Sequence, residues 1–308
     1  MPIAPITLVQ GIAIHVSLTD MRCLPTETLR FANWVFNPGF RGRAEEVYTL
    51  LGDRALTDET RYLNLGDWEG AEDVDTACRQ LVHRVGTAAD LGPGDRVLDV
   101  GFGFGAQDVY WMTRFAPREI VGVNITGPQV AAARRRVAAA GLADRIHLYH
   151  ASATELPLPD QAFDVVVALE CAFHFRTRER FFSEAHRVLR PGGRLVTADI
   201  IPRAGALDRP SLAALGWHFV ATRFDMPRVN AYPASEYRRR LRGAGFSQAE
   251  VASIRDRVYA PLQRALTRDR RVLARQHPLA RLPFQLASRV PPERVFAAFD
   301  YVIAVAER

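Results

Sequence analysis

The sequence predicts an α/β protein with a mostly parallel sheet that carries helices on both faces. Short apolar runs of strand length alternate with segments of helical length through the middle of the chain. The first of these runs, at 97–100, leads into three closely spaced glycines, as a buried parallel strand does before a tight loop. With 308 residues, of which 48% are apolar, the chain is long enough for one large domain with appendages.

The central elements follow in order after this first strand. A helix is expected over 106–115, and a buried strand over 119–124. The next helix runs to about Ala140 and stops at Gly141, and Thr126 with Gln129 has the spacing of a capping box at its start. The remaining central elements are strands over 145–150, 164–170 and 194–200, a helix near 178–189 and a turn at 191–193.

Segments on either side complete the predicted organisation. Behind the core we expect a helix over 234–243, a strand over 248–259 and a final strand over 300–306. Residues 1–90 are predicted to form a helical N-terminal cap, clearest at 74–85, with the core spanning 91–308. Long insertions at 203–231 and 260–297 contain prolines and are expected to carry helices of their own that act as lids over a site.

Charge and composition narrow the function classes. All 40 basic residues are arginines, which excludes any mechanism that needs a lysine. The arginines alternate with 34 acidic residues instead of forming a patch, so no nucleic-acid partner is expected, and the arginine-rich part of the second insertion is interpreted as a solvated helix face. No segment is long and apolar enough to span a membrane, including 2–16.

The cysteines favour a reducing compartment. Cys23, Cys78 and Cys171 are far apart in the sequence and form no pair at metal-ligand spacing. We therefore expect a cytoplasmic protein without a bound metal.

The glycine loop favours a nucleoside ligand. Its spacing, Gly101-Phe-Gly103-Phe-Gly105, lacks the lysine of a phosphate-binding loop, and it lets the backbone approach a ligand closely. Asn124 ends the next strand, where a side chain commonly binds the hydroxyls of a ribose.

At this point the chain resembles the class I S-adenosylmethionine-dependent methyltransferases. The resemblance is carried by VLDVGFGFG at 97–105, VGVNIT at 121–126, SATELPLPDQAFDVVVALE at 152–170 and EAHRVLRPGGRLVTADI at 184–200. It implies a Rossmann-like, seven-stranded fold and S-adenosyl-L-methionine as the cofactor. The methionine part of the cofactor is then expected among Asp99, Gly101, Gly103 and Gly105. Its ribose and adenine are expected near Asn124, Ile125, Gln129, Ser152 and Ala153. Asn124 and Ser152 depart from the acidic residues that many relatives carry at these positions.

Two further segments resemble the small-molecule branch of this family, which includes bacterial natural-product enzymes. They are YLNLGDW at 62–68 and ALECAFHF at 168–175. The resemblance implies methyl transfer to an apolar secondary metabolite, with transfer to oxygen as the first hypothesis. The alternatives are C-methylation of a prenyl diphosphate or another alkene with Glu170 as the base, and a cofactor-binding cyclase or regulator that transfers no methyl group.

Glu170 and His174 are the catalytic candidates, because both follow the strand at 164–170, at the sheet edge where ligands bind in such folds. His174 suits removal of a hydroxyl proton, and Glu170 suits a sulfonium or an alkene. Structural roles for both stay open, as does an orienting role of Asp199 toward His174. The apolar acceptor is expected to contact part of an aromatic set formed by Trp34, Phe36, Phe40, Tyr48, Trp217, Phe219, Phe224 and Met226. A homodimer is left open.

Overall fold

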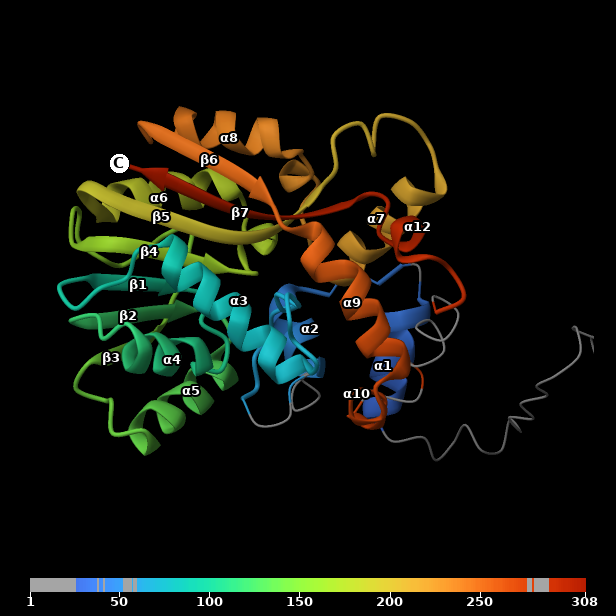
Figure 1. Cartoon of the computed structure of the whole chain (residues 1–308), viewed down its shortest axis with the longest axis horizontal. Helices are drawn as coiled ribbons and strands as arrows, with labels where there is room; N and C mark the ends of the chain where they lie inside the picture. Colours follow the sequence, from blue (N-terminus) through green and yellow to red (C-terminus); the bar gives the residue numbers. More distant parts are fainter. Residues whose placement is uncertain are drawn as a thin grey trace, which may run out of the picture.

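The computed structural model describes residues 26–37, 39–40, 42–51, 57, 60–275, 279 and 288–308. A seven-stranded sheet forms its centre (Figure 1). The strands are β1 (Arg96–Val100), β2 (Glu119–Asn124), β3 (Ile146–His150), β4 (Phe163–Leu169), β5 (Leu189–Pro202), β6 (Gln248–Ser253) and β7 (Phe299–Glu307). Their order is β3-β2-β1-β4-β5-β7-β6, and only β7 runs against its neighbours. The predicted mostly parallel seven-stranded sheet is confirmed.

Helices cover both faces of this sheet, as predicted. The helices of one face are α3 (Val74–Ala88), α4 (Ala106–Arg114) and α5 (Gly127–Ala139). Those of the other face are α6 (Arg178–Val188) and α8 (Ala234–Gly243). Because successive side chains of a strand point to opposite faces, Val97 of β1 packs under the first group and Leu98 under the second.

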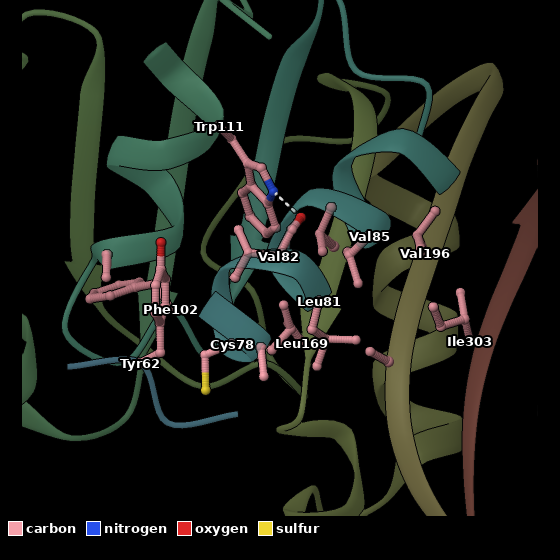
Figure 2. Close-up of a cluster of buried hydrophobic side chains, with 14 of the residues drawn as sticks. Tyr62, Cys78, Leu81, Val82, Val85, Phe102, Trp111, Leu169, Val196 and Ile303 are labelled. Carbon is pink, nitrogen blue, oxygen red and sulfur yellow. Dashed lines mark hydrogen bonds between the residues drawn. The ribbon is translucent and has the colours of Figure 1, made fainter. Parts of the chain in front are cut away.

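The larger core lies between the sheet and α3 (Figure 2). Leu81, Val82 and Val85 of α3 are fully buried in it. Trp111 of α4 packs beside them, and its indole nitrogen donates to the carbonyl of Val82 at 2.8 Å, so a large apolar ring is buried without an unsatisfied N–H. The N-terminal segment therefore contributes α3 to the core of the fold.

Two local predictions were wrong. The strand expected over 248–259 ends at Ser253, and α9 (Arg255–Arg268) follows at once. Its buried Val258, Leu262 and Leu266 recur four residues apart, which is a helical period. The turn expected at 191–193 lies within β5 as a bulge, where Leu189 to Arg194 of β5 face Phe163 to Val165 of β4.

The added helices lie together beyond one end of the strands, at the right of Figure 1. They are α1 (Thr26–Phe36), α2 (Ala44–Leu51), α7 (Leu212–Arg223), α9, α10 (Arg270–Arg275) and α12 (Pro292–Val295), with the short 3-10 turns η2 (Ala172–His174) and η3 (Arg228–Asn230) nearby. Both predicted insertions thus carry helices. Of the arginines in the second insertion, Arg264, Arg268, Arg270 and Arg271 are exposed.

No helix in the described residues is long and apolar enough to cross a membrane. The predictions made for residues 2–16, Cys23 and Arg281 fall outside the described residues.

Candidate active site

A cavity of about 690 Å³ opens at the carboxyl ends of β1, β2 and β4. Chain segments that are far apart in the sequence form its wall: the glycine loop, the ends of β2 and β4, the turn after β3, α2 and the strap at 61–64. Ligands bind at this edge in open α/β sheets, because the loops there diverge from the ends of parallel strands. Of the predicted site residues, the wall includes Gly101, Gly103, Asn124, Ile125, Gln129, Ser152, Ala153, Glu170 and His174.

The glycine loop brings backbone to the wall because its residues adopt conformations that other residues rarely take. Gly101 has φ +76°, and a Cβ there would lie 2.6 Å from the Cβ of Cys171. Gly105, by contrast, is not on the wall. It precedes α4 with φ +73°, and a Cβ there would meet Ala133 of α5 at 3.0 Å. Gly105 therefore allows two helices to pack closely.

Asp99 is also absent from the wall. Its side chain is completely buried below the glycine loop, and its Oδ2 accepts a hydrogen bond of 2.7 Å from Gln107 Nε2. Gln107, which the sequence analysis missed, lines the cavity instead. Its place in the first turn of the helix after the glycine loop was the available signal.

Asn124 and Gln129 form one buried unit at the end of β2. The amide nitrogen of Asn124 donates to Gln129 Oε1 at 2.9 Å, and its oxygen accepts from the backbone nitrogen of Thr126 at 3.3 Å. The predicted capping box is wrong, because Thr126 makes no side-chain bond as N-cap and Gln129 pairs with Asn124. Gln129 Nε2 is buried and has no partner in the described part of the chain, so it is a donor that remains for a ligand.

The neighbouring wall suits a flat aromatic base. Ile125 leaves 53% of its surface exposed after β2. Ser152 and Ala153 form the turn after β3, where Ser152 Oγ lies 3.0 Å from the hydroxyl of Thr154. An exposed apolar side chain, backbone and hydroxyl groups thus lie together beside the unpaired donor of Gln129.

Glu170 is held at the cavity wall by two hydrogen bonds. Its Oε1 accepts from the backbone nitrogen of Leu65 and from the hydroxyl of Tyr301, both at 2.6 Å. Its φ of +51° is unusual for a residue with a side chain, and it turns the chain sharply at the end of β4. Burial raises the pKa of Glu170 to about 8, while the two donors oppose this shift. A cation bound in the cavity would therefore favour the ionised carboxylate.

His174 lies at the end of η2, beside Tyr48 of α2. Its Nε2 is 3.0 Å from the tyrosine hydroxyl, and the two rings meet edge to face. Burial lowers the pKa of His174 to about 4, so the imidazole is neutral at physiological pH. The orienting role considered for Asp199 is wrong, because this carboxylate forms a buried ion pair with Arg178 at 2.8 Å and accepts from Tyr237 at 3.1 Å.

Of the aromatic set expected to contact the acceptor, only Tyr48 lines this cavity. Trp34 packs with Phe224 and Phe31, and Trp217 packs on Phe299, so core packing accounts for them. The wall also includes charged side chains that the sequence analysis did not single out, namely Arg43, Glu45, Arg61, Arg176, Arg180 and Asp225.

Comparison with known proteins agrees with this geometry. A family profile described as a methyltransferase domain matches residues 98–197, from β1 into β5. The erythromycin 3''-O-methyltransferase of Saccharopolyspora erythraea is 38% identical over 239 residues, which cover 75% of this chain and 78% of that protein. This chain belongs to the class I S-adenosylmethionine-dependent methyltransferases.

Two further proteins resemble this methyltransferase, one in sequence and one in fold. The O-methyltransferase cnsE of Penicillium expansum is 31% identical over 217 residues, covering 69% of this chain and 75% of the relative. The crystal structure of the [4+2]-cyclase SpnF superimposes with a TM-score of 0.67 at 22% identity, covering 87% of this chain and 97% of that one. This second likeness shows the fold alone.

The residues of this methyltransferase fit S-adenosylmethionine. The cavity offers close backbone at Gly101 and Gly103, the unpaired donor of Gln129 and the carboxyl group of Glu170. These groups match an amino-acid part, a nucleoside and a sulfonium respectively. No group of three or more histidine, cysteine or acidic side chains among the described residues could hold a metal ion.

Proposed function

We propose that this enzyme methylates a hydroxyl oxygen of an apolar natural product, with His174 as the general base. The observation that carries the proposal is the neutral imidazole of His174 on the cavity wall, hydrogen-bonded to Tyr48. When bound, S-adenosylmethionine supplies the methyl group on a sulfonium and leaves as S-adenosylhomocysteine.

An alcohol is a weak nucleophile until its proton leaves, so transfer to oxygen benefits from a positioned base. Tyr48 donates its hydroxyl proton to His174 Nε2 and takes the proton of the acceptor hydroxyl in exchange. The acceptor O–H bond breaks as the O–C bond forms, and the proton ends on His174. The wall around this pair excludes water and aligns the reacting atoms, which is the main requirement of an in-line displacement.

Glu170 is proposed to stabilise the sulfonium rather than to act as the base. The two donors on its Oε1 favour the ionised carboxylate, which is the form that would stabilise a sulfonium. Because one of these bonds holds Leu65, Glu170 also holds the strap at 61–64 over the cavity. The other expected residues on the cavity wall are proposed to bind the cofactor, namely Gly101, Gly103, Asn124, Ile125, Gln129, Ser152 and Ala153.

The acceptor class is proposed from the curated relatives. The two already described are named as O-methyltransferases, one of them acting on erythromycin. The geranyl diphosphate methyltransferase and the [4+2]-cyclase SpnF resemble this chain in structure at 19% and 22% identity, a likeness of fold that favours neither C-methylation nor a cyclase or regulatory role. We propose a hydroxyl group on a macrolide-like polyketide or its sugar.

Two further proposals concern the setting of the enzyme. The buried free thiols of Cys78 and Cys171 suit a reducing compartment, which supports the cytoplasm. The proposed partner is the small-molecule acceptor, without nucleic acid, and a homodimer stays open.

The test uses purified protein, methyl-labelled S-adenosylmethionine and a panel of acceptors. The panel contains a macrolide with a free sugar hydroxyl, a fatty acid and geranyl diphosphate. We expect label in the macrolide extract as an acid-stable O-methyl ether. Label on carbon, or only on the carboxyl group of the fatty acid, would overturn the acceptor assignment. No transfer to any acceptor, despite cofactor binding, would favour a non-methylating role.

A further inference from the structure

A pair of buried carboxyl groups lies directly below the glycine loop. Asp99 is in β1, Asp108 is in the first turn of α4, and both are completely buried. The two side chains lie close enough to interact with each other. Neither oxygen of Asp108, nor Oδ1 of Asp99, has a hydrogen-bond donor as partner among the described residues.

This arrangement requires a proton between the two groups. Two carboxylates so close in a buried site cannot both be ionised, because their repulsion is not screened by water. Burial raises the pKa of Asp99 to about 7 and that of Asp108 well above its usual value. The thiol of Cys171 interacts with Asp99, and burial raises its pKa as well. The pair therefore shares one proton and carries one negative charge.

Gln107 connects this pair to the cavity. The side-chain nitrogen of Gln107 donates its hydrogen bond to Asp99, because an ionised carboxylate accepts hydrogen bonds and cannot donate them. The oxygen is the end of the amide that remains for a ligand, and the residue lines the cavity next to Gly103 and Phe104. An amide oxygen can only accept, so its partner in the ligand must carry N–H or O–H groups.

We propose that Gln107 accepts a hydrogen bond from the α-ammonium group of S-adenosylmethionine, and that Asp99 and Asp108 hold its amide in this orientation through their shared proton. The inference rests on the proposed placement of the methionine part over the glycine loop. The ammonium group has three donors and a positive charge. It therefore suits the amide oxygen of Gln107, which lies next to the buried negative charge of the Asp99–Asp108 pair. The carboxylate of the same methionine would be repelled there.

Calorimetry with two ligands tests this inference. S-adenosylhomocysteine contains the amino-acid part, whereas 5'-methylthioadenosine keeps the nucleoside and lacks that part. We expect Gln107→Met to bind S-adenosylhomocysteine about tenfold or more weakly, as for a lost hydrogen bond to a charged group. Its affinity for 5'-methylthioadenosine should stay within about twofold of the wild type, which also shows that the variant is folded.

Gln129→Met is the matched control, because it removes a buried amide from the nucleoside end of the same cavity. It should weaken both ligands by similar factors. A Gln107→Met variant that weakens both ligands equally, or neither, would overturn the role of Gln107. A wild-type protein that binds neither ligand would instead overturn the proposed function.

Two variants of Asp108 test the shared proton. Asp108→Asn supplies an amide N–H in place of the carboxyl proton and should keep the affinity for S-adenosylhomocysteine within about threefold. Asp108→Leu keeps the branched shape of the side chain without a donor, and we expect it to lose affinity for this ligand while it still binds 5'-methylthioadenosine. Equal behaviour of the two variants toward S-adenosylhomocysteine would contradict the orienting role of the pair.

Discussion

His174 and Glu170 lie in the same stretch of chain after β4, yet their surroundings favour the opposite roles proposed for them. Burial keeps His174 neutral with a pKa of about 4, and a tyrosine hydroxyl is its hydrogen-bond partner. Burial also raises the pKa of Glu170 to about 8, but its Oε1 already accepts two hydrogen bonds. Neutral His174 can accept a proton, whereas Glu170 is held where a bound cation would favour its ionised form.

His174→Ala should therefore lower kcat by roughly 10²–10⁴, because the acceptor hydroxyl then loses its base. Binding of S-adenosylhomocysteine should stay within about twofold of the wild type. The matched control is His218→Gln, which replaces an exposed histidine of α7 away from the cavity wall. Steady-state kinetics and calorimetry measure both effects, and an unchanged kcat in His174→Ala would exclude the base assignment.

Gly101 offers a second test at this scale. Gly101→Ala should abolish measurable cofactor binding, because its Cβ would collide with Cys171 in addition to the cost of a positive φ. Gly141→Ala is the control. It has a similar φ of +68° with open space around a Cβ, so it should cost only about 1–2 kcal/mol of stability and leave cofactor binding intact. Equal loss of binding in both variants would show that backbone strain alone is responsible.

At the scale of elements, a few specific contacts hold α1 and α2 to the segment around α7. Asp225 follows α7, and its Oδ2 accepts from the backbone nitrogen of Ala44 at the start of α2 at 3.0 Å. Its Oδ1 pairs with Arg176 at 2.5 Å, and Trp34 of α1 donates to the carbonyl of Arg223 at 2.9 Å. A carboxylate at a helix N-terminus is favourable, so Asp225 stabilises the helix that carries Tyr48.

Asp225→Ala should loosen α2 over the cavity. We expect kcat to fall about tenfold and trypsin to cleave at Arg43 faster, with cofactor affinity little changed, because about 1–2 kcal/mol of capping and ion pairing is lost. Asp208→Ala removes an exposed carboxylate from the same insertion and serves as the control. Unchanged proteolysis and kcat in Asp225→Ala would mean that α2 is held by packing alone.

At the scale of the whole molecule, stability should depend on the buried carboxyl groups. Asp99 and Glu170 have raised pKa values in the folded state, about 7 and about 8. A carboxyl group with a raised pKa contributes stability at low pH that is lost as pH rises through the folded pKa. His174 affects stability at acid pH. Because its pKa is lowered to about 4 in the folded state, the free energy of unfolding falls as pH drops from about 6.5 toward 4.

The Tm of the cofactor-free enzyme should therefore fall between pH 6.5 and 9, by roughly 2–4 °C for each kcal/mol lost. S-adenosylmethionine should reduce this fall more than S-adenosylhomocysteine does, because its sulfonium favours ionised Glu170. Thermal unfolding at several pH values measures the difference. In Glu170→Gln, the Tm should change less with pH, and the two ligands should reduce the fall in Tm equally. A wild-type Tm that does not change over this range would contradict the raised pKa values.

The sequence by itself determined the sheet, its parallel core and the glycine loop. These features depend on local order: apolar runs of strand length, glycines where the backbone turns, and residues such as Asn124 at strand ends. The end of β6 was predicted wrongly from the same local order, because the strand pattern of its six residues is followed almost at once by the helical pattern of α9. Within such a run, periodicity identifies each element but not the exact boundary.

Only the tertiary structure decided which side chains meet. Tyr48 reaches His174 across 126 residues, Tyr301 reaches Glu170 across 131, and Asp199 is paired with Arg178 instead of His174. Asp99 lies below the glycine loop, and Gln107 takes its place on the cavity wall. Such pairings depend on how the elements pack in three dimensions. Hydrogen bonding and ionisation act over a few ångströms of space, while a sequence pattern records only neighbours along the chain.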